Sequence, residues 1–163
     1  MPDRKPLDVR MRQRFPLADD GSWEQTSEAT DAYNCAAWAV EVTDGNWWPE
    51  PDSTEYYWPQ GIVRDGSVEA FVAGYSTLGY EVCADGERED GFGKLVLYAT
   101  STGSPQHVAR QLADGRWSSK LGDEEDIVHA EPSSLSASRY GNPRLFMRRR
   151  TVVEDNLTDA QAV

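Results

Sequence analysis

The sequence contains little cysteine and little histidine, and it has no long apolar run. Its 163 residues include two cysteines and two histidines. Two cysteines cannot form a disulfide framework, and no Cys/His cluster has the spacing of a zinc site. No apolar stretch is long enough to cross a bilayer, and the first residues carry no apolar segment of the kind found in signal peptides. These absences predict a cytoplasmic protein without a metal, a cofactor or a membrane anchor.

Positive charge is also scarce, because 28 acidic residues outnumber 16 basic ones and give a net charge of -12. Such a field repels phosphate backbones and anionic lipids, which argues against nucleic acid and membrane surfaces as partners. It favours a cationic or neutral substrate, and a peptide or protein, basic or neutral, fits this expectation. An alternative interpretation is an acidic surface that only maintains solubility.

The chain has the length of one domain. We expect a polar N-terminal arm over residues 1–22, a domain over residues 23–150 and a flexible tail over residues 151–163. Helical patterns come first, beginning after Asn34 and after Ser67, and Gly45 and Gly79 are expected to end them. Strand patterns follow at residues 80–84, 95–99, 107–113, 116–121, 124–129 and 144–149. This order predicts an α+β fold in which a cysteine helix packs on a mostly antiparallel sheet.

The stretch around Cys35 is the first candidate for chemistry. Asn34 is a good N-cap, so the sulfur of Cys35 is expected beside the first-turn amides of a helix, which favour a thiolate. His107 opens a strand of the sheet on which this helix is expected to pack. A cysteine and a histidine in this arrangement form a nucleophile and its general base. The alternative for Cys35 is a small buried apolar residue.

The turn at residues 113–115 decides which side chain orients His107. A two-residue loop at Asp114–Gly115 would place Ser118 and Lys120 on the face of His107. A three-residue loop with Gly115 left-handed would place Trp117 and Ser119 there instead. Lys120 is otherwise expected to be solvated, and His129 is expected to be a surface or structural residue.

The motifs Tyr33-Asn34-Cys35 at a helix start and His107-Val108 at a strand start, followed by a glycine-containing hairpin, resemble the NlpC-type and CHAP-type branch of papain-like cysteine hydrolases. This resemblance implies a papain-like domain with Cys35 as the nucleophile and His107 as the base. It places the third catalytic position on Ser119. The chain departs from that branch in its Ala36-Ala37 pair and in having serine at the third position. The whole chain also resembles a group of bacterial proteins with no assigned activity, which share Asn-Cys-x-x-Trp-Ala and Trp-x-Ser-Lys-Leu-Gly segments.

The resemblance implies a thiol-dependent hydrolase or acyltransferase acting on an amide, isopeptide or acyl bond. An irregular aromatic loop between Trp47 and Trp58 is expected to form part of its substrate cleft. The expected substrate-binding residues are Asn34, Trp38, Trp47, Trp48, Trp58 and Trp117.

Two alternatives give the same residues other roles. In the first, the same fold has no activity and works as a binding or immunity-type protein that holds a basic partner on its acidic, aromatic surface. In the second, Cys35 pairs with Cys83 in a redox or structural role. A cytoplasmic location argues against the second alternative, because thiols stay reduced there.

Overall fold

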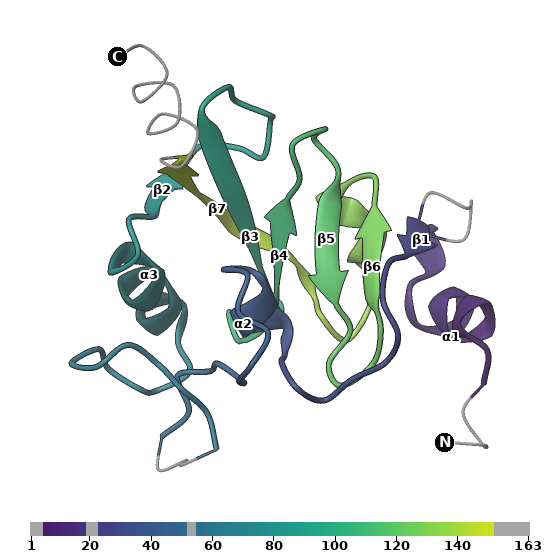
Figure 1. Cartoon of the computed structure of the whole chain (residues 1–163), viewed down its shortest axis with the longest axis horizontal. Helices are drawn as coiled ribbons and strands as arrows, with labels where there is room; N and C mark the ends of the chain where they lie inside the picture. The colour runs from purple at the N-terminus through teal and green to yellow at the C-terminus, as the bar shows by residue number, and fades with distance from the viewer. Residues whose placement is uncertain (1–4, 19–22, 52–54, 152–163) are drawn as a thin grey trace, which may run out of the picture.

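Seven strands form a single antiparallel sheet in the computed structural model, which describes residues 5–18, 23–51 and 55–151 (Figure 1). The strand order is β1-β6-β5-β4-β3-β7-β2, and every neighbouring pair is antiparallel. The strands are β1 (Trp23–Gln25), β2 (Glu81–Cys83), β3 (Phe92–Ala99), β4 (Pro105–Gln111), β5 (Trp117–Lys120), β6 (Asp126–His129) and β7 (Asn142–Arg150).

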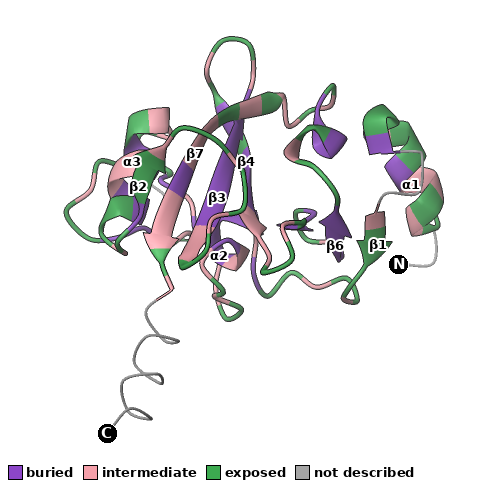
Figure 2. Ribbon diagram, turned by 90° about the horizontal axis from the view of Figure 1, so that it is seen from above, coloured by how far each residue is buried: buried purple, intermediate pink, exposed green. Residues whose placement is uncertain are grey.

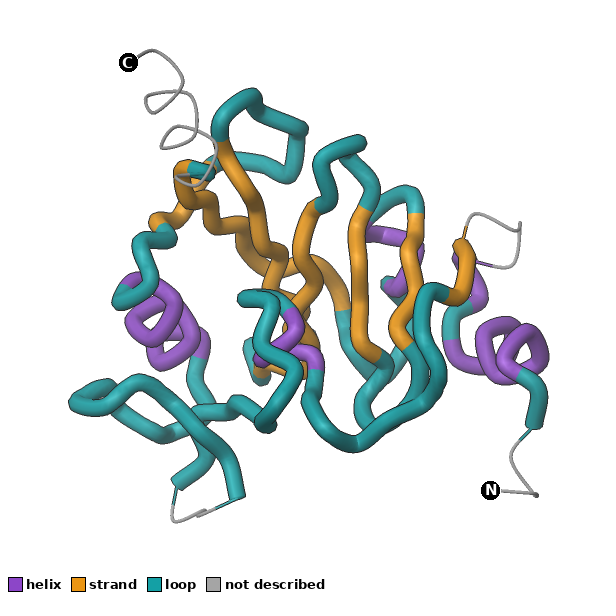
Figure 3. The backbone as a smooth tube through the Cα atoms, in the orientation of Figure 1, coloured by secondary structure: helices purple, strands orange, loops and turns teal. Residues whose placement is uncertain are grey.

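The helices are short and few in the described part of the chain, as the tube in Figure 3 shows. They are the α-helices α1 (Leu7–Arg14), α2 (Cys35–Trp38) and α3 (Val68–Ser76), with the 3₁₀ turns η1 (Pro16–Ala18) and η2 (Pro132–Leu135). This architecture corrects the expected papain-like α+β fold with its cysteine helix. The protein is instead a β-rich fold, because the sheet is continuous over seven strands and α2 contributes only one turn to its cover.

Apolar clusters cover both faces of the sheet. On one face, residues of α2 and α3 pack against Leu95, Leu97, Val108 and Met147. On the other face, α1, η1 and η2 pack against the residues with the opposite parity in the same strands. That second cluster is formed by Met11, Phe15, Ala18, Val96, Tyr98, Ala109, Trp117, Leu121, Ile127 and Leu135. Strands β3 and β4 are therefore buried over most of their length (Figure 2).

The helix after Ser67 is confirmed. The Ser67 hydroxyl accepts a hydrogen bond from the Ala70 amide, and Gly79 has a left-handed backbone (φ 95°) three residues after the helix ends.

The helix after Asn34 exists, but it ends much earlier than the sequence pattern predicts. Glu41 takes the left-handed conformation (φ 63°), and Val42 N–H donates back to the Ala37 carbonyl at 3.0 Å. These contacts form a Schellman motif, in which glycine usually occupies the left-handed position. The expected end at Gly45 was wrong, because the chain had already left the helix.

Two elements were missed. Residues 1–22 were expected to be an arm, and they contain the helix α1, whose Met11 is buried in the second cluster. Strand β1 pairs with β6 at the edge of the sheet, with Trp23 opposite His129. The sequence signal was weak in both places, because α1 is mostly polar and β1 has three residues. The tail expected over residues 151–163 lies, apart from Thr151, outside the described residues.

Gly74 tests how tightly α3 packs on the aromatic loop. A Cβ atom at this position would lie 2.3 Å from the Trp58 ring, which is buried and donates its indole N–H to the Ala70 carbonyl. Alanine would gain about 1 kcal/mol of helix propensity. Overpacking costs about 1–3 kcal/mol, and the held ring cannot move away. We expect Gly74→Ala to lower the free energy of unfolding, measured in urea.

Gly45→Ala is the matched control for this substitution, because nothing lies within 4 Å of the Cβ that it adds. We expect Gly45→Ala to change stability by no more than about 0.5 kcal/mol. A Gly74→Ala variant as stable as Gly45→Ala would show that the Trp58 ring is free to shift.

Candidate functional site

Cys35 occupies the first position of α2, where the side chain of Asn34 caps the helix. The Asn34 Oδ1 accepts hydrogen bonds from the Ala37 amide at 3.2 Å and from the Trp47 amide at 2.9 Å. Its Nδ2 donates to the Trp47 carbonyl at 2.8 Å. Asn34 therefore does more than cap the helix, because the same amide group also fixes the start of the aromatic loop beside Cys35.

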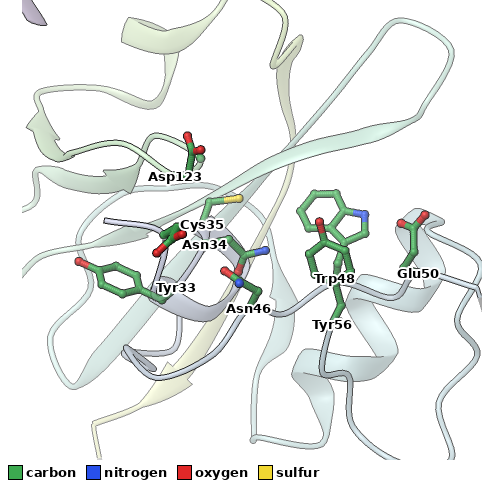
Figure 4. Close-up of a pocket in the computed structure, with 10 residues that line it drawn as sticks. Tyr33, Asn34, Cys35, Asn46, Trp48, Glu50, Tyr56 and Asp123 are labelled. Atoms are coloured by element: carbon green, nitrogen blue, oxygen red, sulfur yellow. The ribbon is translucent and has the colours of Figure 1, made fainter. Parts of the chain in front are cut away.

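A cavity of about 400 Å³ opens at this end of α2. Figure 4 shows the Cys35 sulfur between Asp123 on one side and the group of Trp48, Tyr56 and Glu50 on the other. The lining residues come from three segments of the chain: Asp31, Tyr33, Asn34, Cys35, Asn46, Trp48, Glu50, Tyr56, Gly122 and Asp123. The walls thus combine carboxylates, aromatic rings and side-chain amides around one thiol. We call this space the Cys35 pocket.

His107 and Ser119 are brought together in the structure. The His107 Nε2 lies 2.9 Å from the Ser119 Oγ, and that Oγ lies 2.8 Å from the His129 Nε2. The His129 Nδ1 lies 2.9 Å from the Glu131 carbonyl oxygen. All three side chains are fully buried. A chain of hydrogen bonds therefore crosses from β4 through β5 to the end of β6.

The direction of each hydrogen bond in this chain follows from its last acceptor. A carbonyl oxygen can only accept, so the His129 Nδ1 carries the proton and its Nε2 accepts from the Ser119 hydroxyl. The Ser119 oxygen then accepts from the His107 Nε2–H. The ring of His107 is consequently left with a bare lone pair on Nδ1, and this buried atom has no hydrogen-bond partner among the described residues.

The same burial holds both rings neutral. Desolvation lowers the pKa of His107 well below its usual value, and the neighbouring His129 lowers it further. Burial lowers the pKa of His129 to about 4. The His107 ring also stacks on Tyr140, with ring centroids 4.0 Å apart and an interplanar angle of 4°. These contacts fix the plane of the imidazole.

No hydrogen bond joins Cys35 to His107. The two side chains lie on different faces of the sheet. Val108 of β4 packs with the cluster that contains α2, whereas the His107 ring of the same strand lies on the opposite face, against Tyr98 and Tyr140. However, β4 and β5 pair only at Arg110–Ser118 and Gln111–Trp117. Towards His107 the ladder stops, and the backbone amide of Val108 faces the Cys35 sulfur. The sulfur thus lies at the seam where the two strands part.

Cys35 is a neutral thiol at this position. Burial raises its pKa to about 11, although the backbone amides of Val108, Ala36 and Cys35 and the charge of Lys120 all act to lower it. The expected thiolate is therefore not favoured, because loss of water outweighs the few amides of a one-turn helix.

The three-residue hairpin loop is the one that the structure contains. Leu112 N–H donates to the Arg116 carbonyl at 2.7 Å, and Gly115 has a left-handed backbone (φ 92°). Ser119 is therefore on the His107 face, as predicted for that loop. Ser118 and Lys120 face the other way, and the Ser118 hydroxyl accepts from the Trp38 indole at 2.8 Å.

Lys120 is fully buried, so its expected exposure to solvent was wrong. Its ammonium donates to the carbonyls of Thr30 at 2.6 Å, Gly122 at 2.9 Å and Glu124 at 2.5 Å. Three carbonyl acceptors allow a lysine to stay in the interior at the end of β5. The bonds tie together the two loops that carry Asp31 and Asp123, on the rim of the Cys35 pocket.

Of the six expected substrate-binding residues, Asn34 and Trp48 line the Cys35 pocket. The other four support the fold. Trp47 and Trp58 are buried in the α2/α3 cluster, and Trp117 is buried in the opposite one. Trp38 is half-buried under the Arg110 guanidinium, 4.4 Å from its ring centroid. Sequence spacing could not separate rings that face a cleft from rings that fill a core.

Several pocket residues were missed by sequence reasoning: Asp31, Tyr33, Asn46, Glu50, Tyr56, Gly122 and Asp123. Nothing in the sequence around Asp123 indicates that it lies beside Cys35. Tyr33 directly precedes the Asn34-Cys35 pair, which was the one available signal. Its hydroxyl donates to Asp126 at 2.6 Å, and burial raises its pKa to about 12.

Cys35 and Cys83 are free thiols, so the structure does not contain the disulfide considered above. Within the described ranges, no group of three or more His, Cys, Asp or Glu residues is arranged to hold a metal ion. None of the helices described has the length and apolar character needed to cross a membrane.

Residues 24–148 match the family described as a domain of unknown function (DUF7689). The match covers most of the chain, so the protein belongs to this family. No curated protein and no solved structure matches the chain. The family description names no activity, and any function must therefore be argued from the site itself.

The neutral histidines predict how stability changes with pH. The pKa of His129 is about 4 in the folded protein and near 6.5 when unfolded, so the unfolded chain binds more protons between these values. We expect the free energy of unfolding to fall as the pH is lowered from 6.5 towards 4, by about 3 kcal/mol for this ring alone. Urea titrations at several pH values measure this loss.

His129→Gln is the matched variant, because glutamine can still hydrogen-bond with Ser119 but does not titrate. We expect it to be less stable than the native chain at pH 7 and to lose less stability on acidification. Parallel pH profiles of the two proteins would contradict a neutral, buried His129.

Proposed function

We propose that this protein is a thiol-dependent hydrolase or acyltransferase, in which Cys35 is the nucleophile and His107 the general base. The single observation that carries the proposal is the bare Nδ1 of His107. A buried polar atom without a partner costs about 1–3 kcal/mol, and such atoms are rare in native proteins. An imidazole held in one tautomer with a free lone pair has the properties of a base, and the only buried thiol among the described residues lines the Cys35 pocket.

Ser119 and His129 act as positioning residues in this proposal. The Ser119 oxygen holds the His107 Nε2–H, and His129 directs the Ser119 hydroxyl away from His107. The arrangement performs the task of the third member of a catalytic triad, which is to fix the ring orientation and tautomer.

The reaction begins from neutral groups. The Cys35 thiol gives its proton to the His107 Nδ1 as Sγ attacks the carbonyl carbon of the substrate. The carbon–sulfur bond forms, and the carbonyl oxygen becomes an oxyanion. When this intermediate collapses, the leaving amine or alcohol takes the proton from Nδ1. Water, or an acceptor amine or alcohol, then attacks the thioester with His107 again as base.

This chemistry requires the sulfur and the imidazole to come closer than they are in the resting structure. Catalytic hydrogen bonds in unliganded enzymes are often long and tighten when substrate binds. The side chain of Cys35 lies at the seam between β4 and β5, so rotation about its Cα–Cβ bond is the movement that closes the distance. The Val108 amide beside the sulfur is a donor for the developing oxyanion.

The pocket walls favour an acyl substrate that carries positive charge, such as a peptide or protein with a basic side chain near the bond. Asp31, Glu50 and Asp123 supply negative charge around Cys35, and Trp48 and Tyr56 supply ring faces. A reducing, cytoplasmic location fits this proposal, because a nucleophilic thiol must stay free.

Alkylation with iodoacetamide tests the proposed pair. In a Cys83→Ser background Cys35 is the only thiol, and its alkylation rate reports its activation. We expect His107→Gln to slow alkylation of Cys35 by about tenfold or more, because general bases contribute about 10²–10⁴-fold. The rate in the parent protein should rise steeply above pH 9, since the pKa of Cys35 is raised to about 11.

Ser119→Ala is the second variant in this experiment. It frees the His107 ring without removing the base, so alkylation should fall by less than in His107→Gln. Circular dichroism and tryptophan fluorescence confirm that each variant is folded. If the parent protein and both variants are folded and Cys35 is alkylated equally slowly in all of them, His107 is not the general base.

A second candidate function is binding of a basic partner without catalysis, and the charge of the pocket favours it. Three carboxylates and three aromatic side chains line the cavity beside the thiol. This arrangement recognises an amine or guanidinium group whether or not a reaction follows.

Titration with an arginine- and lysine-rich peptide tests binding alone. We expect tryptophan fluorescence to change on binding, because Trp48 lines the pocket. Asp123→Asn and Glu50→Gln should each weaken binding several-fold, and high salt should weaken it further. Cys35→Ala should bind as the native chain does. An affinity for the peptide that neither acidic substitution changes would rule out the Cys35 pocket as the binding site.

A further inference from the structure

A second cavity, of about 620 Å³, lies on the same face of the sheet as α2 and α3 but beyond the other end of α2. Its walls come from the chain after α2, the chain after α3, and the ends of β3, β4 and β7. The lining residues are Ala39, Glu41, Leu78, Tyr80, Gly93, Lys94, Arg110, Gln111, Arg149, Arg150 and Thr151. We call this cavity the arginine hollow.

Gly93 makes the hollow possible. Strand parity places this residue on the α2/α3 face with Leu95, directly opposite Arg149 of β7. A Cβ atom added to Gly93 would meet nothing within 4 Å. The missing side chain therefore leaves open space on the sheet surface, at a strand position where any residue would be accepted sterically.

The arginines around this space lack the short ion pairs that several other arginines make. Elsewhere, Arg10, Arg14, Arg116 and Arg148 make ion pairs with carboxylates at 2.8–3.0 Å. In the hollow, the described side chains pair Arg110 only with the exposed Glu41, at 3.9 Å, and give Arg149 and Arg150 no carboxylate partner. Lys94 is paired with Asp85 and Glu89. The Arg150 guanidinium lies over the Phe92 ring, on the opposite face of the sheet from Gly93 and Arg149. Two guanidinium groups, those of Arg110 and Arg149, thus face one carboxylate in a protein of net charge -12.

Polar groups of the hollow are also left without partners. The buried Nε of Arg110 has no hydrogen-bond acceptor, although its guanidinium is held over Trp38. Arg149 is held in place by the Leu78 carbonyl at 3.1 Å and by the Tyr80 ring, 4.5 Å from its Cζ. No described group bonds the Tyr80 hydroxyl. Fixed donors with open valences are what an oxyanion requires.

We propose that the arginine hollow binds a small molecule bearing a phosphate monoester group, with the phosphate held by Arg110, Arg149 and the Tyr80 hydroxyl above Gly93. Two guanidinium groups and a phenol hydroxyl offer more donors than the two oxygens of a carboxylate accept in one plane, and they suit the three terminal oxygens of a phosphate monoester. The volume is in the range of about 300–1,000 Å³ that small-molecule sites occupy. This site is independent of the Cys35 pocket and does not depend on the reaction proposed there.

Inorganic phosphate is the probe that tests this proposal. We expect phosphate to raise the melting temperature above that in sodium chloride of the same ionic strength, and to shift the backbone amide resonances of Tyr80, Gly93 and Arg110 saturably. Succinate, a dicarboxylate, should bind more weakly. No response beyond that to chloride would overturn the site, and tighter binding of succinate would overturn its assignment to phosphate.

Two variants locate the binding. Arg149→Gln removes one guanidinium, and Gly93→Val fills the floor while keeping strand propensity. Each should weaken phosphate binding about tenfold or more, whereas Arg12→Gln, an exposed substitution on α1, should leave it unchanged. Because Gly93→Val leaves every arginine in place, it decides the question if Arg149→Gln does not fold. Unchanged binding in Gly93→Val would overturn the proposal.

Discussion

The hydrogen-bond chain from His107 through Ser119 and His129 to the Glu131 carbonyl is the interaction on which this end of the sheet depends. Backbone pairing between β4 and β5 stops at Arg110 and Ser118. Beyond that point the strands are joined on one face by side chains instead of by a ladder. Without backbone hydrogen bonds, a gap that we call the seam separates the two strands here. A residue on the opposite face of the sheet can therefore contact the backbone of β4. Cys35 lies there because α2 begins at the seam.

Strand β5 serves both faces with alternate residues, and its two sets of side chains have different tasks. Ser119 orients an imidazole on one face. On the other face, the Ser118 hydroxyl accepts a hydrogen bond from the Trp38 indole. The Lys120 ammonium donates hydrogen bonds to the two loops that form one wall of the Cys35 pocket. Lys120 can be buried only because three carbonyl groups accept hydrogen bonds from its ammonium. The pocket and the imidazole are therefore positioned by the same short strand, although they lie on different faces of it.

The parts of the fold and site that depend on short-range contacts could be predicted from the sequence. The caps at Asn34 and Ser67, and the left-handed Gly115 that places Ser119 with His107, are decided by a few neighbouring residues. Features set by distant contacts were missed. His129 looked peripheral because nothing in its segment indicates that the Ser119 hydroxyl of the neighbouring strand is within hydrogen-bond distance. The end of α2 was misjudged because Glu41 occupies a position where glycine is the usual signal. The papain-like fold was wrong because short motifs carry the order of elements but not the extent of a sheet.

Charge is distributed along α2 in a way that composition conceals. Carboxylates surround its N-terminal end in the Cys35 pocket, and the guanidinium groups of Arg110 and Arg149 lie beyond its C-terminal end in the arginine hollow. The four-residue helix spans only about 6 Å at 1.5 Å per residue. A net charge of -12 predicts attraction of cations everywhere, yet one region of the surface has the opposite sign. In both proposals, recognition therefore depends on which end of α2 a ligand meets, rather than on its total charge.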